Sequence, residues 1–232
     1  MRMFTIFTTL LALAILAAPA ARAAEVQGHG YLWETWVADT FFGGYRQASY
    51  TQQRDIPAEA NTVHGGIPVN PKFTKFRTPI DLGDALRQFD IDEPFLLIIG
   101  YWVQEGDSKR IVNVVAARVE PAQWRALWGG IARADLERLD AAIKDRDIDP
   151  LEARRRAQEI KAQPPFRTAA ITLNPKIDAQ GQRRLQCSLS FDKVFTDLAP
   201  GASREATESP ELWGVGVPPP FYSLPRSSDS PD

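Results

Sequence analysis

A continuous apolar segment, Phe95 to Val103, constrains the fold more than any other part of the sequence. It has the length of a strand, and an apolar run without alternation is typical of a strand that is buried on both faces. A polar turn that contains Gly106 follows, and the Val- and Ala-rich segment from Arg110 to Val119 comes next. The sequence therefore predicts a central β-hairpin.

Other segments have the periodicity and end signals of helices and shorter strands. The clearest boundary is at Asp149, an N-cap acid followed by Pro150 in the first helical position and Glu152 in the place of a capping box. The pattern predicts helices at residues 31–39, 81–89, 121–128, 134–144, 150–161 and 192–198. It predicts further strands at residues 50–54, 67–70, 168–173 and 184–191. The expected fold class is α/β (α+β), with a mixed central β-sheet flanked by helices.

The first residues match an export signal. Arg2 supplies a positive start, residues 4–18 form an apolar run, and residues 21–23 form a small-x-small cleavage site. We therefore expect a cleaved signal peptide at residues 1–23 and a periplasmic or secreted protein, with an uncleaved N-terminal anchor as the alternative. No later segment is apolar over the roughly 20 residues that a spanning helix needs, so we expect no transmembrane segment in the mature chain.

Residues 24–199 are expected to form a single domain. From Ala199 onward the composition shifts to Pro, Ser, Glu and Gly, which predicts a Pro-rich extended or disordered tail at residues 200–232. Four apolar residues would let this tail dock locally on the domain: Leu212, Trp213, Phe221 and Tyr222. Nothing in the sequence indicates the oligomeric state.

Charge and residue counts exclude several classes of site. Without the signal peptide the 27 basic side chains fall to 25, against 29 acidic ones, so any polyanion site needs basic residues gathered on one face. Cys187 is the only cysteine, which excludes an intrachain disulfide. The only histidines, His29 and His64, lack zinc-site spacing, and neither a Walker sequence nor a dinucleotide glycine pattern occurs. We therefore expect no zinc and no nucleotide cofactor.

An acid and a lysine near the ends of two consecutive strand-like runs form the strongest candidate site. Asp55 follows residues 50–54, and Lys72 follows residues 67–70, with a Gly-bearing turn between them. In adjacent antiparallel strands, Asp55 and the Asn70 amide oxygen would hold Mg²⁺, Lys72 would orient or activate water, and Glu34 on the preceding helix would bind or position a second ion. In the alternative reading, Asp55 caps a turn, Lys72 is a surface lysine and Glu34 faces solvent.

This element order resembles the restriction-endonuclease-like PD-(D/E)XK nucleases. Arg54-Asp55 stands at the first motif position, Asn70-Pro71-Lys72 at the second, and the Glu34 helix at the place of the leading helix. The amino-acid sequences of residues 66–72 and 182–188 also resemble those of restriction-type endonucleases. The resemblance covers about residues 28–195, and it implies a restriction-endonuclease-like core and a magnesium-dependent endodeoxyribonuclease.

Two features depart from that family. Asn70 stands where an acid is usual, and its neutral oxygen should bind a hard cation more weakly. The export signal is the other, because restriction enzymes act in the cytoplasm. A non-catalytic periplasmic binding or interaction protein is therefore the competing hypothesis. If DNA is bound, the candidate contacts border the site or lie near the loop between the last two long strands: Lys75, Arg77, Lys176, Arg183 and Arg184. Charge that protects an exposed hairpin edge is the alternative for these residues.

Overall fold

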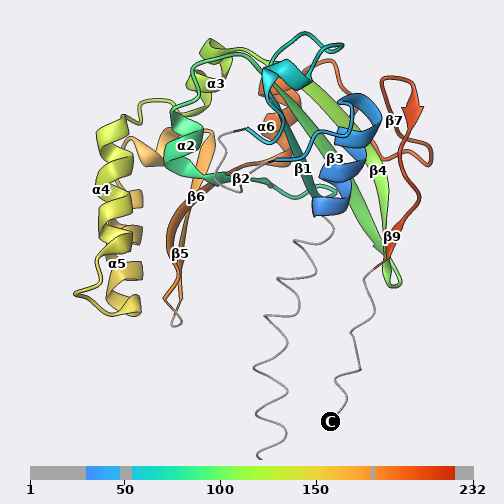
Figure 1. Ribbon diagram of the computed structural model, residues 1–232. Coiled ribbons are helices and arrows are strands. Elements are labelled where there is room, and N and C mark those ends of the chain that lie inside the picture. Colours follow the sequence, from blue (N-terminus) through green and yellow to red (C-terminus); the bar gives the residue numbers. More distant parts are fainter. Residues whose placement is uncertain (1–29, 48–53, 179–180, 223–232) are drawn as a thin grey trace, which may run out of the picture.

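The computed structural model describes residues 30–47, 54–178 and 181–222. The expected signal peptide, residues 50–53 of the expected strand at 50–54 and residues 223–232 of the expected tail lie outside the described residues. Strands form two sheets and a small hairpin (Figure 1). They are β1 (Val69–Lys75), β2 (Ile80–Asp84), β3 (Phe95–Glu105), β4 (Ser108–Val119), β5 (Ile171–Ile177), β6 (Arg183–Leu189), β7 (Glu211–Leu212), β8 (Val215–Gly216) and β9 (Phe221–Tyr222).

Helices flank these sheets, so the α/β class with a mixed sheet is confirmed. They are the helix at residues 30–41, α2 (Ala85–Phe89), α3 (Pro121–Leu127), α4 (Arg133–Lys144), α5 (Pro150–Lys161) and α6 (Phe191–Lys193). A π-helical turn, Val194–Leu198, continues α6, and two short 3-10 turns lie at Ala58–Ala60 and Phe166–Thr168. Among the described residues, none of the helices combines the length and the apolar character needed to cross a bilayer.

The predicted hairpin lies at the centre of the larger sheet. Its strand order is β1-β3-β4-β9, in which β3 pairs with β4 in antiparallel and with β1 in parallel orientation. Residues 95–101 of β3 are all buried. This confirms the inference that an apolar run without alternation marks a strand covered on both faces.

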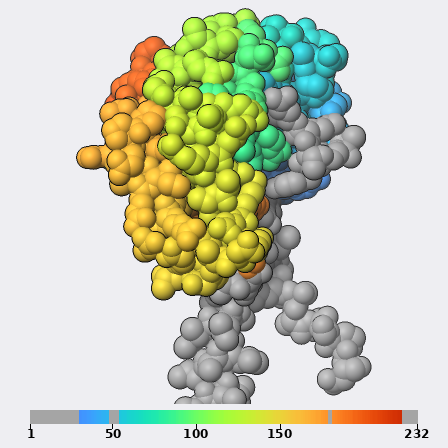
Figure 2. Space-filling model, turned by 90° about the vertical axis from the view of Figure 1, so that its left-hand side faces the viewer, coloured from blue at the N-terminus to red at the C-terminus, as the bar shows by residue number. Residues whose placement is uncertain are grey.

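The larger sheet separates two hydrophobic clusters. Phe95, Leu97 and Ile99 belong to the first cluster, together with the second sheet, ordered β2-β6-β5, and helices α2 to α6. Figure 2 shows α4 and α5, in yellow, as the outer layer on that side. Leu96 and Ile98 belong to the second cluster, with the helix at 30–41 and part of the C-terminal segment. Burial on both faces thus follows from one strand that serves two cores.

The helix at 30–41 approaches β3 closely because Gly100 has no side chain. Trp33 of that helix is fully buried and stacks on Phe73 of β1, with ring centroids 5.8 Å apart. A Cβ atom on Gly100 would lie 2.9 Å from the Trp33 ring and 3.0 Å from the Phe73 ring. Gly100 therefore fixes the distance between helix and sheet, and with it the position of Glu34, the next residue along the helix.

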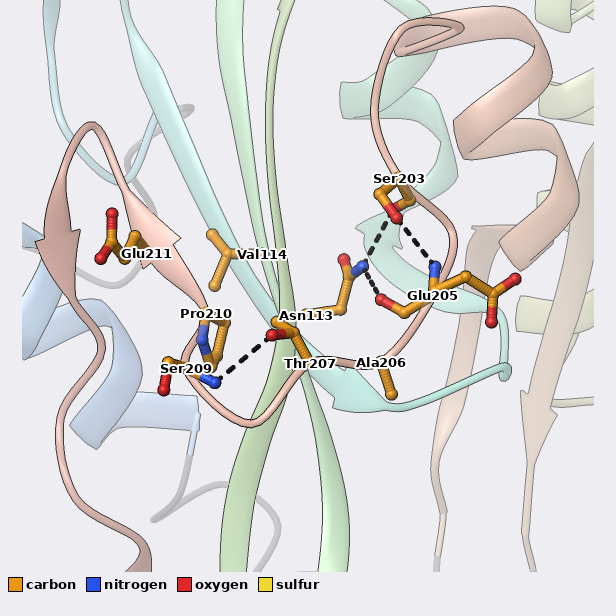
Figure 3. Close-up of a pocket in the computed structure, with 9 residues that line it drawn as sticks. All are labelled: Asn113, Val114, Ser203, Glu205, Ala206, Thr207, Ser209, Pro210 and Glu211. Carbon is orange, nitrogen blue, oxygen red and sulfur yellow. Dashed lines mark hydrogen bonds between the residues drawn. The ribbon is translucent and has the colours of Figure 1, made fainter.

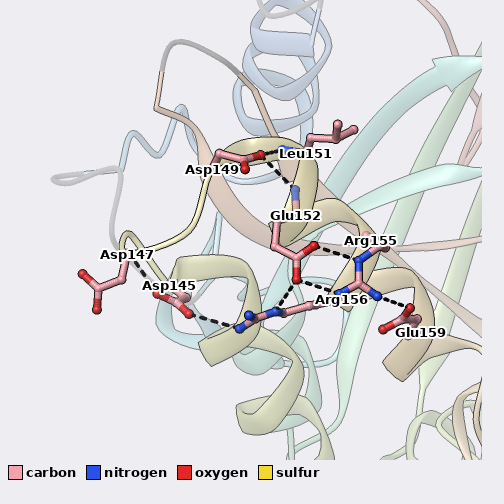
Figure 4. Close-up of polar contacts among 8 residues, drawn as sticks. All are labelled: Asp145, Asp147, Asp149, Leu151, Glu152, Arg155, Arg156 and Glu159. Atoms are coloured by element: carbon pink, nitrogen blue, oxygen red, sulfur yellow. Dashed lines mark hydrogen bonds and ion pairs between the residues drawn. The ribbon is translucent and has the colours of Figure 1, made fainter.

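The start of α5 confirms the predicted N-cap but not the capping box. The Asp149 carboxylate accepts hydrogen bonds from the backbone N–H groups of Leu151 and Glu152. The Glu152 side chain instead binds Arg155 and Arg156, one turn further along the helix (Figure 4). The acid at that position is therefore used in surface ion pairs, which agrees with a solvated arginine face.

Two expectations about secondary structure were wrong. Residues 81–84, expected in a helix, belong to strand β2, because Ile80 and Leu82 also alternate with polar residues and the strand pairs with β6 across a bulge at Gly83. Strand β5 begins at Ile171 rather than Thr168 and continues to Ile177, through residues expected to form a loop. Pro175 is tolerated there because β5 lies at the edge of its sheet.

Residues 200–222 of the expected tail are docked on β4. The Asn113 side-chain amide donates hydrogen bonds to the carbonyls of Ser203 and Glu205, at 2.9 and 2.8 Å (Figure 3). Further along, β9 pairs with the start of β4, and Leu212 is buried in the second cluster. Local docking therefore describes this segment better than disorder does.

We expect Gly100→Ala to lower the free energy of unfolding by about 1–3 kcal/mol, because the added methyl group overpacks the seat of Trp33. Chemical denaturation measures the change. Gly216→Ala is the control, because a Cβ there meets nothing within 4 Å. Equal stabilities for both variants would show that Gly100 does not set the helix-to-sheet distance.

Candidate functional site

Four side chains predicted from the sequence meet in one pocket. Glu34, Asp55, Asn70 and Lys72 all line a cavity of about 1030 Å³ between the helix at 30–41, strand β1 and the β2–α2 region. Asn70 and Lys72 are two residues apart on β1, and alternate residues of a strand share a face. The alternative in which Glu34 faces solvent and Lys72 lies on the surface does not describe this arrangement.

Asp55 is held by its chain neighbours rather than by a strand. It lies in a bend, with Arg54 on one side and Ile56 on the other. The buried Arg54 guanidinium forms an ion pair with Glu93 at 2.9 Å, and Ile56 forms an isolated antiparallel bridge with Val69. The expected antiparallel approach to β1 is therefore present as one bridge. In the larger sheet, the partner of β1 is the parallel strand β3.

Asp55 and Lys72 form the central contact of the pocket. The Lys72 ammonium donates a hydrogen bond of 2.9 Å to Asp55 Oδ2, and both side chains are largely shielded, with 22% and 29% of their surface exposed. Burial alone would lower the pKa of Lys72, but the charge and hydrogen bond of Asp55 raise it, with smaller contributions from Glu34 and Asp81. Lys72 is therefore a cation at neutral pH. It supplies positive charge and orientation, and it does not serve as a base.

Glu34 is the titratable group with a pKa close to neutrality. Its pKa is raised to about 7, chiefly by burial and in smaller part by the charge of Asp55, while Lys72 opposes the shift. A carboxyl group with such a pKa exchanges a proton readily near neutral pH. Glu34 is therefore the side chain in this pocket that can accept or release a proton.

Amide groups complete the surroundings of Asp55. Asn70 is almost fully buried, and its Oδ1 accepts a long hydrogen bond of 3.5 Å from the Asp55 backbone N–H. Gln47 donates a hydrogen bond of 3.1 Å to Asp55 Oδ1. Sequence analysis missed Gln47, since a glutamine in a connecting segment carries no signal of its own. Near Glu34, the buried Thr35 hydroxyl, which also lines the pocket, has no partner among the described residues.

The pocket has few oxygen donors, but their chemistry suits a hard divalent cation. Among the described residues, no group of three His, Cys, Asp or Glu side chains is placed to hold a metal ion. The pocket instead offers the carboxylates of Glu34 and Asp55 and the Asn70 amide oxygen. Mg²⁺ is commonly held by one or two carboxylates together with waters and substrate phosphates. Burial and, in smaller part, the charge of Asp55 raise the Glu34 pKa, and a cation would offset both effects, so the donor set fits Mg²⁺.

Cationic and aromatic side chains line other parts of the same pocket. Arg46 pairs with Asp39 at 2.7 Å, and Arg87 lies 3.9 Å from Asp84. No local pattern singles out these two arginines, because the pocket that they line is formed by segments far apart in the chain. The other cationic and aromatic side chains that line the pocket are Tyr31, Tyr45 and Arg184.

The five predicted nucleic-acid contacts have different environments. Lys75, Arg77, Lys176 and Arg184 are exposed, and Arg184 lines the pocket. Arg183 is buried, and its guanidinium donates hydrogen bonds to the carbonyls of Ile143 and Ile148. It holds the end of α4 and the following loop against β6, so Arg183 is corrected from a ligand contact to a structural residue.

His64 lies apart from these groups. Its ring stacks on Trp213 with centroids 3.6 Å apart, and partial burial lowers its pKa.

No protein-family model, curated protein or solved structure matches the chain. The chemistry of the site is therefore argued from its own geometry.

We expect Glu34→Gln to stabilise the protein at pH 8 and to change it little at pH 4. The folded pKa of about 7 lies above the ordinary 4.5, so the contribution of Glu34 to stability is greatest below pH 4.5 and declines as pH rises to 7. A neutral amide avoids that loss of stability. The loss is about 3 kcal/mol at most, since each pKa unit corresponds to about 1.4 kcal/mol.

Denaturation at both pH values measures this difference, with Glu59→Gln on an exposed 3-10 turn as the control. The same stability change at pH 4 and pH 8 would contradict a raised Glu34 pKa.

Proposed function

We propose that the protein is a magnesium-dependent phosphodiester hydrolase that cleaves DNA internally. One observation carries the proposal: Glu34, Asp55, Asn70 and Lys72, from separate segments, line one pocket. Oxygen donors beside a lysine ammonium are the groups that metal-assisted phosphodiester hydrolysis requires. The same residues carry the resemblance to restriction-endonuclease-like nucleases, and we include a core of that type in the proposal.

Each side chain has a distinct role in this proposal. Asp55 and Asn70 would hold Mg²⁺, with Glu34 beside them, and the ion would supply Lewis-acid chemistry at the phosphate. The Lys72 ammonium orients the phosphate and stabilises the negative charge that develops on its oxygens. Glu34, with a pKa near 7, accepts the proton of the attacking water. The leaving oxygen of the cleaved ester takes a proton from solvent.

A second candidate function is a non-catalytic binding protein. Lys72 and Asp55 form an ion pair in the described structure, so each neutralises the other, and Asn70 supplies no charge to a cation. An exposed apolar group, Val63, Trp213 and Val215, offers a surface for another partner. In both cases we propose export to the periplasm or beyond, on the basis of the signal sequence. Measured activity decides between the two functions.

We expect the purified protein to nick supercoiled plasmid in the presence of Mg²⁺ or Mn²⁺, and Lys72→Ala to lower the rate about 10²–10³-fold. Loss of one preorganised stabilising donor typically has an effect of this size. The control is Lys193→Ala, which removes an exposed lysine that pairs with Asp197 outside the pocket. Unchanged cleavage by Lys72→Ala would reject the site, and no cleavage by the parent protein with either metal would favour the binding protein.

We also expect Asn70→Asp to raise Mg²⁺ affinity about tenfold or more, because a carboxylate replaces a neutral oxygen in the donor set. Without metal the variant should melt at a lower temperature than the parent at pH 8, since a further negative charge is placed beside Glu34 and Asp55. A titration of melting temperature against Mg²⁺ measures both effects.

Asn174→Asp, on β5 outside the pocket, is the matched control. A Mg²⁺ response that is equal in both variants and the parent would remove Asn70 from the metal site.

A further inference from the structure

The β5–β6 hairpin has one apolar face and one polar face. On β6, Leu185, Cys187 and Leu189 are buried in the first cluster, with α4 and α5. The alternate residues point to the opposite side of the sheet. We call that side the hairpin face, and it consists of Thr172, Asn174 and Lys176 of β5 and Arg184, Gln186 and Ser188 of β6.

The cations of the hairpin face are opposed to each other rather than to acids. Lys176 lies directly across from Arg184 in the strand register, and both are exposed. Neither side chain forms an ion pair or hydrogen bond with another residue in the described part of the chain. Like charges directly opposite each other destabilise a sheet. Their placement is accounted for if an anion lies across both of them.

The arginines of α5 differ in this respect. Arg155 and Arg156 are paired with Glu152, Glu159 and Asp145 (Figure 4). These two arginines are thus neutralised within the protein, whereas Lys176 and Arg184 have no acidic partner among the described residues.

Protection of the sheet edge does not explain both cations. β5 is an edge strand, so Lys176 can discourage pairing with another chain. β6 is the central strand of the β2-β6-β5 sheet, and a central strand presents no free edge. Arg184 therefore requires another explanation, and phosphate binding supplies one.

Amide side chains lie beside the two cations. Gln186 is directly opposite Asn174 in the register. Asn174 Nδ2 donates a hydrogen bond of 2.9 Å to Ser188 Oγ, while the Gln186 amide has no partner among the described residues. Asparagine and glutamine amides recognise base edges, adenine above all, in the major groove. The hairpin face carries no aromatic side chain, so it lacks the stacking platform that single-stranded nucleic acid requires.

The hairpin face continues into the pocket. Arg184 lines both surfaces, and β2, which borders β6, contributes Gly83 and Asp84 to the pocket wall. The acids nearest the face are engaged in the protein: Asp84 caps α2, and Asp81 accepts a hydrogen bond of 2.9 Å from the Gly83 N–H. Arg184 therefore connects the hairpin face with the pocket, and Lys176 lies next to it on the neighbouring strand.

We propose that the hairpin face binds double-helical DNA, with the β5–β6 ribbon in the major groove and the cleavable phosphate in the pocket. This inference rests on the proposed function and adds the substrate class to it. Lys176 and Arg184 contact phosphates, and Gln186 and Asn174 read base edges. Strand β2 borders β6 only from Gln186 to Leu189, so residues 183–185 and their partners on β5 form a two-stranded ribbon. A two-stranded ribbon fits the roughly 12 Å width of the B-DNA major groove.

Fluorescence anisotropy with a labelled 30-base-pair duplex, in EDTA so that no cleavage occurs, tests the proposal. We expect the purified protein to bind duplex DNA more tightly than the same single strand or a duplex RNA, whose deep major groove excludes the ribbon. Lys176→Ala/Arg184→Ala should reduce the slope of log affinity against log salt by about 1.8, since each phosphate contact contributes about 0.9.

Two further variants make the result specific. Arg138→Ala/Arg155→Ala removes the same charge from α4 and α5, on the other side of the sheet, and should leave the salt slope unchanged. Gln186→Ala removes an amide without a described partner, so it should fold normally. It should weaken binding about 5- to 100-fold to sequences that the parent protein enriches from a random duplex library, and leave binding to unselected duplex unchanged.

Failure of this inference and failure of the proposed function give different results. An unchanged salt slope in Lys176→Ala/Arg184→Ala, a preference for single strands or duplex RNA, or no DNA binding at all would overturn the hairpin face as the duplex site, even if plasmid cleavage is observed. Duplex binding with the expected slope change, but without cleavage by the parent protein with Mg²⁺ or Mn²⁺, would support the hairpin face and reject the hydrolase.

Discussion

The burial of β3 on both faces is the constraint on which the rest of the structure depends. One face needs the second sheet and helices α2 to α6, and the other needs the helix at 30–41 and the C-terminal segment. That helix can reach the sheet because Gly100 leaves room for the Trp33 ring. The pocket exists because this contact places Glu34 beside β1, so the packing of one strand determines where the polar groups of the site lie.

The electrostatics of the pocket depend on that packing in turn. Two carboxylates and one ammonium are gathered in a pocket that largely shields them, and Asp55 influences the protonation of the other two groups. Asp55 keeps Lys72 protonated, and Asp55 together with burial raises the pKa of Glu34 to about 7. The result is a division of roles in which the lysine supplies charge and the glutamate exchanges a proton. A cation between the acids would complete the balance of charge, and the proposal of metal-assisted hydrolysis rests on this point.

Local sequence signals were sufficient where one pattern excluded the others. The hairpin of β3 and β4 follows from an apolar run with a polar turn, and the start of α5 follows from Asp149 and Pro150. Residues 81–84 were mistaken for helix because Leu82, Leu86 and Phe89 fit helical spacing, whereas Ile80 and Leu82 also fit the strand alternation that pairing with β6 selects. At Arg183, a charged residue in a strand was assigned to ligand binding, but only the loop that follows α4 shows that its partners are carbonyl groups.

The sequence by itself determined the types of residue available for chemistry: two acids, an amide and a lysine on segments that could meet, with no cysteine pair and no zinc spacing. It also determined which strand had to be central. Only the tertiary structure decided that these side chains share a pocket, that Lys72 is paired and Glu34 shielded, and that Lys176 and Arg184 face each other on an open sheet. The physical reason is that burial and charge proximity depend on contacts between segments far apart in the chain, whereas periodicity and capping depend on near neighbours.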